Sequence, residues 1–248
     1  MTNRYDYAVI SDLHINSDAC VTKSLISFLE NIYDDKIKID RLIINGDILD
    51  SYSLNKLSAD QLKIFDLLHW LNYKERVLWI EGNHDRPAEK LQALCGFKLL
   101  KSLVVSSGRK IIYLEHGDRA DDFIQKHPKL TKGADFIYWL LQKIDGSHRL
   151  ARMAKHGSKD FVKCVSKVAN YGLALGERDG YDAVICGHTH YASVVSNNKT
   201  SYFNSGCWTE KPCTLLTIDE GKIDLRMYRR KKGGISDPIQ NVSQLEGE

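Results

Sequence analysis

The sequence predicts an α/β fold: a layered sheet with helices on its faces and a helical cap insertion. Three observations support this class. Short apolar runs rich in β-branched residues recur along the chain, as in strands buried on both faces. Amphipathic segments separate the first three runs, which indicates strand–helix alternation. The stretch from about residue 119 to 178 contains no run of strand type, and its pattern favours helices.

Each expected element has its own signal. The runs of strand type are Tyr7–Ile10, Leu42–Ile44, Val77–Ile80, Leu103–Val105, Ile111–Leu114, Ala183–Cys186 and Thr214–Ile218. Thr22–Ile32 and Leu62–Leu71 place apolar side chains at helical spacing and predict helices. Ser106–Arg109 has the composition of a hairpin turn. After Cys186 the pattern predicts strands alone.

One domain accounts for residues 1–228, because a chain of 248 residues is long enough for one substantial core. The strandless stretch at about 119–178 lies between two of the motifs described below, so we expect it to form a cap over their site. Residues 229–248 are polar and basic, with Gly233, Gly234 and Pro238. We expect them to form a flexible tail.

Composition excludes several classes. The six cysteines are scattered without a C-x-x-C pair, which favours reduced thiols and a cytoplasmic protein. The first ten residues are too polar for a secretory signal. The sequence contains no run of about 18 apolar residues, the length that a membrane-spanning helix requires. The formal net charge of +3 is too small to favour a nucleic-acid partner.

Five polar motifs each follow a run of strand type. They are Asp12-Leu13-His14, Gly46-Asp47-Ile48-Leu49-Asp50, Gly82-Asn83-His84-Asp85, His116-Gly117-Asp118 and Gly187-His188-Thr189-His190. Residues two apart at a strand end point to the same side, and open α/β sheets bind ligands at that edge. A turn or a satisfied histidine explains each motif alone, but the five together predict a metal site. Carboxylate, imidazole and amide donors without thiolate suit Mn, Fe or Zn.

The ordered set D-x-H, G-D-x-x-D, G-N-H-D, a single H and G-H-x-H resembles the signature of the calcineurin-like metallophosphoesterases. It runs from Asp12 to His190. The resemblance implies a β-sandwich flanked by helices and two divalent ions, manganese first, with iron or zinc as alternatives. It implies that one ion is held by Asp12, His14, Asp47 and His190. It implies that the other is held by Asp47, Asn83, His116 and His188, so that Asp47 bridges the two.

The resemblance also implies a hydrolase that cuts a phosphodiester or pyrophosphate bond. Two ions about 3.5–4 Å apart lower the pKa of a bridging water and supply hydroxide at neutral pH. His84 would protonate the leaving oxygen, and Asp50 would orient the His84 ring. Arg86 would bind a substrate phosphate through two donors. A solvated surface charge explains Arg86 equally well.

Within that superfamily the chain looks most like the UDP-2,3-diacylglucosamine diphosphatase-like branch. Tyr181–Cys186 leads directly into the Gly-His-Thr-His motif, and Tyr202–Glu210 resembles that branch's N-x-G-D-W-x-E stretch. Two residues depart from the pattern. His84 stands where the best-known enzymes of the branch have Arg, and Cys207 stands where an aspartate is usual. The resemblance implies a nucleotide-diphospho-lipid as substrate.

The expected cap is basic and rich in aromatic residues. Between Phe123 and Asn170, ten Lys or Arg accompany three Asp. Trp139 falls off the apolar helical stripe of its segment, and we expect it to contact the apolar part of an anionic substrate. The basic charge also suits peripheral contact with an anionic membrane surface, at the inner face of the membrane. A solvated helical face is the simpler explanation of these charges.

Two other functions fit the same residues. A phosphoprotein phosphatase, a cyclic-nucleotide phosphodiesterase or a nuclease would use the same chemistry on another substrate. A non-catalytic binding scaffold that kept the fold belongs to a different class. We expect such a scaffold to have lost metal ligands or the proton donor, whereas the sequence contains all seven candidate ligands and His84.

Overall fold

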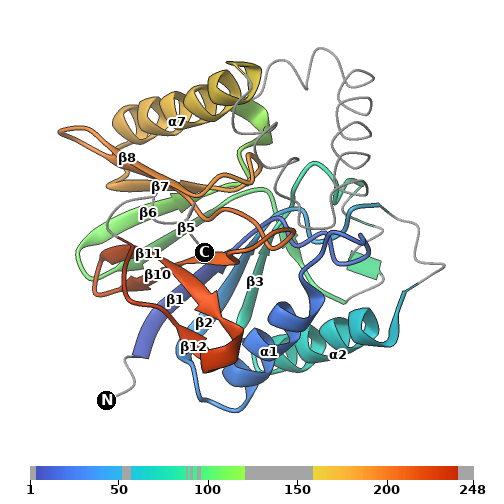
Figure 1. The fold of residues 1–248 in the computed structure, drawn as a ribbon. Helices are drawn as coiled ribbons and strands as arrows, with labels where there is room; N and C mark the ends of the chain where they lie inside the picture. The colour runs from blue at the N-terminus through green and yellow to red at the C-terminus, as the bar shows by residue number, and fades with distance from the viewer. Residues whose placement is uncertain are drawn as a thin grey trace.

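The computed structural model describes residues 4–51, 57–87, 89, 92–93, 96–120 and 159–239. Over these residues the chain forms two β-sheets packed face to face, with helices on both outer faces (Figure 1). The helices α1 (Thr22–Tyr33) and α2 (Ala59–Tyr73) cover one face, and α7 (Lys159–Asp179) covers the other. The molecule is therefore a four-layered helix–sheet–sheet–helix sandwich.

The first sheet has seven strands and a parallel centre. Its strands are β1 (Arg4–Ile10), β2 (Lys38–Asn45), β3 (Val77–Ile80), β4 (Leu99–Leu100), β10 (Thr214–Asp219), β11 (Lys222–Arg229) and β12 (Gly234–Ile235). The order is β12-β11-β10-β1-β2-β3-β4. Strands β1 to β4 run parallel, whereas β10, β11 and β12 join by antiparallel pairs. The carboxyl ends of β1, β2 and β3 therefore meet at one edge.

The second sheet has five strands. They are β5 (Leu103–Ser107), β6 (Lys110–Leu114), β7 (Ala183–Cys186), β8 (Ser193–Ser196) and β9 (Ser201–Asn204), in the order β5-β6-β7-β9-β8. Strands β6, β7 and β9 are parallel, and β5 and β6 form the expected hairpin. Its two-residue turn begins at Gly108, whose φ of 54° lies in the region that glycine adopts without strain.

Alternation along the strands distributes apolar side chains among three hydrophobic layers. Ala8 and Ile10 of β1 pack in the layer of α1 and α2, whereas Val9 between them faces the second sheet. In the same way, Val184 of β7 packs under α7 and Ile185 faces the first sheet. The period of two thus makes each strand contribute to two cores at once.

The helices on the first sheet form for local reasons that the sequence shows. In α1, Leu25, Leu29 and Ile32 are buried at helical spacing, and truncation of Leu29 to Ala would cost about 2–5 kcal/mol. The helix α2 starts at a capping box, in which Ser58 and Gln61 each accept the other's backbone N–H. Within the described residues, no helix combines the length and hydrophobicity that crossing a bilayer requires.

The predicted α/β class is confirmed. Each of the seven predicted strands lies within an observed strand, and the two predicted helices are α1 and α2. After Cys186 the described residues form strands and one short 3-10 helix, η2 (Arg230–Lys232).

The stretch predicted as a cap differs from expectation in its last part. From Val168 onward, the buried side chains of α7 pack on β7 and β9 instead of covering the strand ends. Gly172 permits the close approach, since a Cβ there would lie 2.5 Å from the Tyr202 ring. Residues 121–158, which include Trp139, lie outside the described residues, and their assignment to a cap stays a prediction.

The tail predicted to be flexible begins later than residue 229. Arg229 ends β11, and β12 pairs with β11 through Gly234 and Ile235. Hydrogen bonds hold this segment: Asn31 Nδ2 of α1 donates to the Gly233 carbonyl (3.1 Å), and the Met227 N–H donates to Ser236 Oγ (3.0 Å). A polar composition therefore indicated disorder where these side chains stabilise an edge strand. Residues 240–248 lie outside the described part.

Candidate metal centre

The five polar motifs converge at one end of the sandwich. The first sheet brings three of them there, after β1, β2 and β3, and the second sheet brings two, after β6 and β7. Six of the seven candidate ligands fall into two clusters whose ligand atoms lie within 4.8 Å of one another. The clusters are Asp12, His14 and His190, and Asp47, His116 and His188.

In the first cluster, donors from the two sheets face one another. His190 Nε2 lies 3.1 Å from Asp12 Oδ1 and 3.3 Å from His14 Nε2. Asp12 is fully buried, and His14 is 5% exposed. Two imidazole nitrogens and a carboxylate oxygen thus point at a common position, as ligands of one cation do.

In the second cluster, His116 Nε2 lies 3.2 Å from Asp47 Oδ2. The same Asp47 oxygen lies 3.8 Å from His14 Nε2 of the first cluster. The ring of His188 lies 5.3 Å from that of His116. Asp47 therefore stands between the two clusters, the place that a bridging carboxylate requires.

Unsatisfied buried atoms test whether these residues fit a cation. Asn83 Oδ1 is buried and makes no hydrogen bond to any of the described residues. Asp12 Oδ1 and His116 Nε2 are also buried without a well-directed hydrogen bond in the described part of the chain, and their close polar neighbours are other candidate ligands, His190 Nε2 at 3.1 Å and Asp47 Oδ2 at 3.2 Å. Buried polar atoms in folded proteins almost always have a partner, so each such atom requires an explanation. A divalent ion would satisfy all three, and the donor set of carboxylate, imidazole and amide oxygen suits Mn, Fe or Zn.

The charges in the centre shift one another's pKa. Burial raises the pKa of Asp12, but the imidazoles of His190 and His116 outweigh it and bring this pKa to about 2. Burial lowers the pKa of His116, but the Asp47 carboxylate raises it to about 10. Without a metal the His116 imidazole is therefore protonated beside the Asp47 carboxylate, and a cation has to replace that proton.

The backbone that presents the ligands is strained. Five candidate ligands have a positive φ of 43–68°, which non-glycine residues rarely adopt. They are Asp12, His14, Asp47, His188 and His190. Hydrogen bonds hold this conformation: the N–H groups of Leu13 and His14 both donate to the Asp47 carbonyl, at 2.9 and 3.0 Å. The Asp12 carboxylate in turn accepts the His188 N–H at 3.1 Å.

Three motif glycines leave space for ligands from other motifs. A Cβ on Gly46 would lie 2.2 Å from His116 Nδ1, and one on Gly82 would lie 2.1 Å from Asp47 Oδ1. A Cβ on Gly187 would lie 2.6 Å from Asp12 Oδ2. Glycine is therefore required at each of these positions, because any side chain would clash with a candidate ligand.

Asp85 is a positioning residue that the sequence reasoning did not single out. It is fully buried, and its carboxylate accepts the N–H groups of Ile48 (2.9 Å), Leu49 (3.3 Å) and Gly82 (2.9 Å). Burial and the charge of Asp47 raise the pKa of Asp85 to about 6. Its position directly after Asn83 and His84 was a signal, but the sequence does not distinguish such an anchor from a ligand.

The expected role of Asp50 toward His84 is only partly met. His84 Nδ1 lies 2.8 Å from the backbone carbonyl of Asp50, so the main chain orients the ring. The Asp50 carboxylate instead lies 3.4 Å from His14 Nδ1, and that imidazole lowers the pKa of Asp50. The reason lies in the turn: Asn16 Oδ1 accepts the Asp50 N–H (2.8 Å), which fixes the backbone there.

Arg86 lies beside the centre but has carboxylate partners. Its Nη2 atom is 2.9 Å from Asp118 Oδ2, and its Nε atom is 3.7 Å from Glu81 Oε1. The guanidinium expected to bind a substrate phosphate is therefore engaged within the protein. Asp118 was part of a quoted motif, but its pairing could not be read from the sequence.

The stretch from Tyr202 to Glu210, which suggested the diphosphatase-like branch, has a structural role. Asn204 Nδ2 donates to the Gly187 carbonyl (2.6 Å), and the Trp208 N–H donates to the Asp12 carbonyl (3.1 Å). Cys207, at the position where an aspartate is usual, is buried and accepts a hydrogen bond from Thr209 (3.2 Å). These residues support the metal-site loops from behind.

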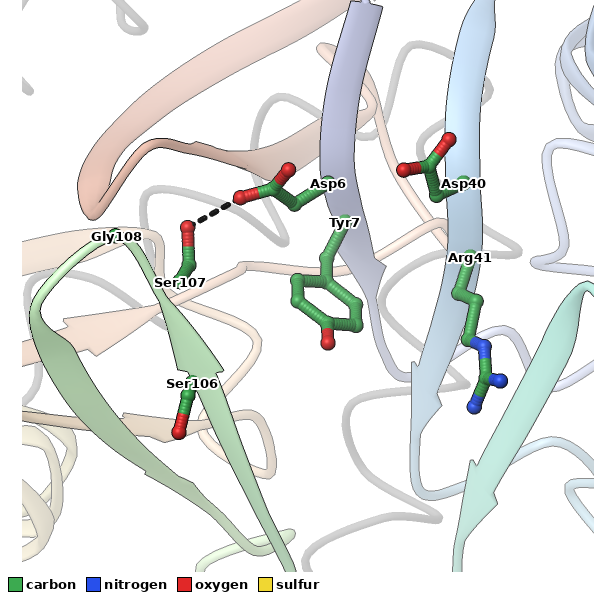
Figure 2. A pocket seen from close by; sticks show the side chains of 7 residues that line it. All are labelled: Asp6, Tyr7, Asp40, Arg41, Ser106, Ser107 and Gly108. Carbon is green, nitrogen blue, oxygen red and sulfur yellow. Dashed lines mark hydrogen bonds between the residues drawn. The ribbon is translucent and has the colours of Figure 1, made fainter.

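A polar hollow of about 430 Å³ lies at the opposite end of the sandwich (Figure 2). Its lining comes from the amino ends of β1 and β2 and from the β5–β6 turn. Figure 2 shows Asp6 accepting a hydrogen bond from Ser107. Asp6 also accepts the Glu220 N–H (3.2 Å). The carboxylate of Asp6 thus serves the fold, since it links the two sheets.

Solved structures with similar folds are phosphoesterases and vacuolar sorting proteins. Yfce, a phosphoesterase from E. coli, is 14% identical with a TM-score of 0.51 and covers 94% of this chain and 97% of its own. A predicted phosphoesterase from Streptococcus pneumoniae is 17% identical (TM-score 0.45; 93% and 92% covered). Vps29 complexed with Zn²⁺ from Entamoeba histolytica is 15% identical (TM-score 0.46; 93% and 95%).

At these identities the structural likeness concerns the fold alone. Comparison with curated proteins gave no match. The sequence profile of the calcineurin-like phosphoesterases, in contrast, matches residues 6–192, which include all five motifs. The chain therefore belongs to the calcineurin-like phosphoesterase family.

Proposed function

We propose that the protein is a dinuclear metal-dependent hydrolase of a phosphodiester or pyrophosphate bond. The observation that carries this proposal is the pair of Asp/His clusters with Asp47 between them. The unsatisfied buried atoms Asp12 Oδ1, Asn83 Oδ1 and His116 Nε2 support it. Asp12, His14, Asp47 and His190 would hold the first ion, and Asp47, Asn83, His116 and His188 would hold the second.

When bound, two divalent ions supply an activated water and neutralise charge on the phosphoryl oxygens. The chain supplies the rest. The Asp47 carboxylate, oriented by the His84 N–H that donates to its Oδ1 (3.0 Å), would hold both ions. His84 Nδ1–H donates to the Asp50 carbonyl (2.8 Å), so the doubly protonated ring would give its second proton, on Nε2, to the leaving oxygen and remain as the neutral imidazole. We propose manganese as the resident metal, with iron or zinc as alternatives.

For the substrate we propose a nucleotide-diphospho-lipid such as UDP-2,3-diacylglucosamine. The resemblance of the motifs and of residues 202–210 to that branch supports this choice. The basic charge between Phe123 and Asn170 suits such an anionic lipid at the inner face of a membrane. Trp139 is its proposed contact, whereas Arg86, the other contact that the sequence offered, is paired with Asp118.

A substrate panel with added Mn²⁺ tests the proposal. It compares UDP-2,3-diacylglucosamine, a phosphopeptide, a cyclic nucleotide and a short DNA, with products identified by mass spectrometry. Release of UMP and a sugar 1-phosphate is expected, and Asp47→Asn is the inactive control. Turnover of the cyclic nucleotide or the DNA alone would change the substrate and keep phosphodiester hydrolysis, whereas turnover of the phosphopeptide alone would show a phosphomonoesterase. No turnover of any member by metal-loaded protein would favour a binding scaffold.

A further inference from the structure

The loop that carries Asn83 and His84 has to keep a fixed distance from the second sheet. Asn83 and His84 follow β3 of the first sheet, whereas His116 follows β6 of the second. Under the proposed function, Asn83 and His116 hold the same ion. The relative position of the two loops therefore sets whether both ligands reach that ion.

Within the first sheet this loop is held by buried hydrogen bonds. The Asp85 carboxylate accepts N–H groups from Ile48, Leu49 and Gly82, and Asp47 Oδ1 accepts the His84 N–H. These bonds join the loop to the end of β2. They do not cross to the second sheet.

The end of β2 is joined to the His116 loop by buried hydrogen bonds, from Asn45 Nδ2 to the Glu115 carbonyl (3.0 Å) and between His116 Nδ1 and the Asn45 carbonyl (2.9 Å). The ion pair between Arg86 and Asp118 joins the Asn83–His84 loop to the His116 loop directly. Arg86 ends the loop and Asp118 begins the short 3-10 helix η1 (Asp118–Ala120), two residues after His116. The helix η1 is itself anchored, because Ala120 packs with Val168 and Ala169 of α7. Asp118 is therefore a fixed partner, 9% exposed, for a guanidinium that is 45% exposed.

A second carboxylate, that of Glu81, also lies near the Arg86 guanidinium, at 3.7 Å. Glu81 lies at the start of the loop, and its N–H donates to the Leu100 carbonyl (2.8 Å). The Arg86 guanidinium lies between Glu81 and Asp118. A half-exposed ion pair adds little to global stability, so its value lies in geometry.

We propose that Arg86 is a positioning residue that holds the Asn83–His84 loop against the His116 loop through Asp118. The inference rests on the proposed function and assigns a role that differs from phosphate binding. Loss of either partner loosens the same contact. The two single changes are then equivalent, and the second change has nothing left to remove.

A double-mutant cycle tests this role. The variants are Arg86→Gln, Asp118→Asn and the double change, with Arg86→Lys as partial rescue. The matched control is Arg4→Gln, which removes the exposed ion pair with Asp40 at the far end. Mn²⁺ affinity is measured by titration calorimetry, and kcat and KM are measured on bis(p-nitrophenyl) phosphate. Hydrogen exchange of residues 82–87 reports the loop without metal.

Each single variant is expected to lose about tenfold in Mn²⁺ affinity or kcat, as for other residues that orient ligands. The double variant also loses about tenfold instead of a hundredfold, and exchange in residues 82–87 rises equally in all three. A higher KM in Arg86→Gln alone, with Asp118→Asn unchanged, would show phosphate binding and overturn the inference. So would unchanged affinity, kcat and exchange in every variant. If the wild-type protein binds no Mn²⁺, the proposed function is wrong. Hydrogen exchange without metal then still shows whether the Arg86–Asp118 pair holds the loop.

Discussion

Both ends of the sandwich carry aspartates, but these differ in burial and in the partners of their carboxylates. At the carboxyl ends of the parallel strands, Asp12 and Asp47 are buried beside imidazoles, and Asp12 Oδ1 has no well-directed hydrogen bond to the described residues. At the other end, Asp6 accepts hydrogen bonds from Ser107 and Glu220, and Asp40 pairs with Arg4.

This difference separates binding chemistry from structural chemistry. Carboxylates at the far end are matched by donors of the protein, so nothing further is required there. Those of the metal centre lie on left-handed backbone. One oxygen of each accepts a backbone N–H, that of His188 for Asp12 and that of His84 for Asp47, and the other oxygen faces the imidazoles of the clusters. A buried carboxylate oxygen that accepts no well-directed hydrogen bond, more than the residue type, therefore marks the functional end.

The largest contrast is expected between Asp47→Asn and Asp6→Asn. Asp47 lies between both clusters, so its neutralisation should reduce hydrolysis to background and weaken Mn²⁺ binding. Asp6→Asn should keep activity within about twofold and cost about 1 kcal/mol of unfolding free energy, as for one hydrogen bond. Hydrolysis rates measure the activity, titration calorimetry measures Mn²⁺ binding, and urea unfolding measures the stability. Equal losses of activity in the two variants would erase the contrast between the ends.

Next in size is His84→Ala, which separates the proton donor from the ligands. Its ring is oriented by the Asp50 carbonyl, and its own ligand atom groups with His14 and Asp50, apart from Asp12 and Asp47. We expect kcat to fall by about 100-fold or more, as for loss of a general acid, with Mn²⁺ affinity unchanged. The loss should shrink for a p-nitrophenyl leaving group, which needs little protonation. If wild-type protein and variant have a comparable kcat on a substrate whose leaving group needs protonation, His84 is not the proton donor.

A smaller effect is expected from Gly82→Ala, with Gly180→Ala as its counterpart away from the centre. A Cβ at Gly82 would press on Asp47 Oδ1 at 2.1 Å, whereas nothing lies within 4 Å of one at Gly180. Gly82→Ala should weaken Mn²⁺ binding by about 10–100-fold, the range for disturbed ligand orientation. Gly180→Ala should cost only about 1 kcal/mol of stability, because its φ is 78°. Identical Mn²⁺ affinities would mean that the crowding at Gly82 is harmless.

The smallest signal is proton release on metal binding. The Asp47 carboxylate raises the pKa of His116 to about 10, so the metal-free imidazole is protonated at pH 8. Binding should then release about one proton at this histidine, and affinity should rise with pH toward 10. Calorimetry at pH 8 in two buffers of different ionisation enthalpy measures the release. A binding enthalpy independent of buffer would contradict it.

The sequence predicted the strands and helices because each has a local cause. The continuous apolar run at Ala8, Val9 and Ile10 and the spacing of Leu25 and Leu29 are visible without the fold. The motifs were placed correctly at strand ends for the same reason. Polar residues that stabilise an edge strand through long-range hydrogen bonds, such as Ser236, looked like a tail instead.

Side-chain partners could not be predicted, since they depend on tertiary geometry. The sequence assigned Asp50 to His84 by its spacing, yet the turn held by Asn16 directs the carboxylate to His14. It offered Arg86 as a phosphate ligand, yet Asp118 from the other sheet reaches it. Both differences arise where two loops from distant parts of the chain meet.

A crystal of the protein grown with Mn²⁺ and measured at the manganese edge tests the central claim most directly. The account predicts two anomalous peaks about 3.5–4 Å apart. One should contact Asp12, His14 and His190, the other Asn83, His116 and His188, with Asp47 contacting both. A single peak, or full manganese occupancy elsewhere with none beside Asp47, would contradict the account.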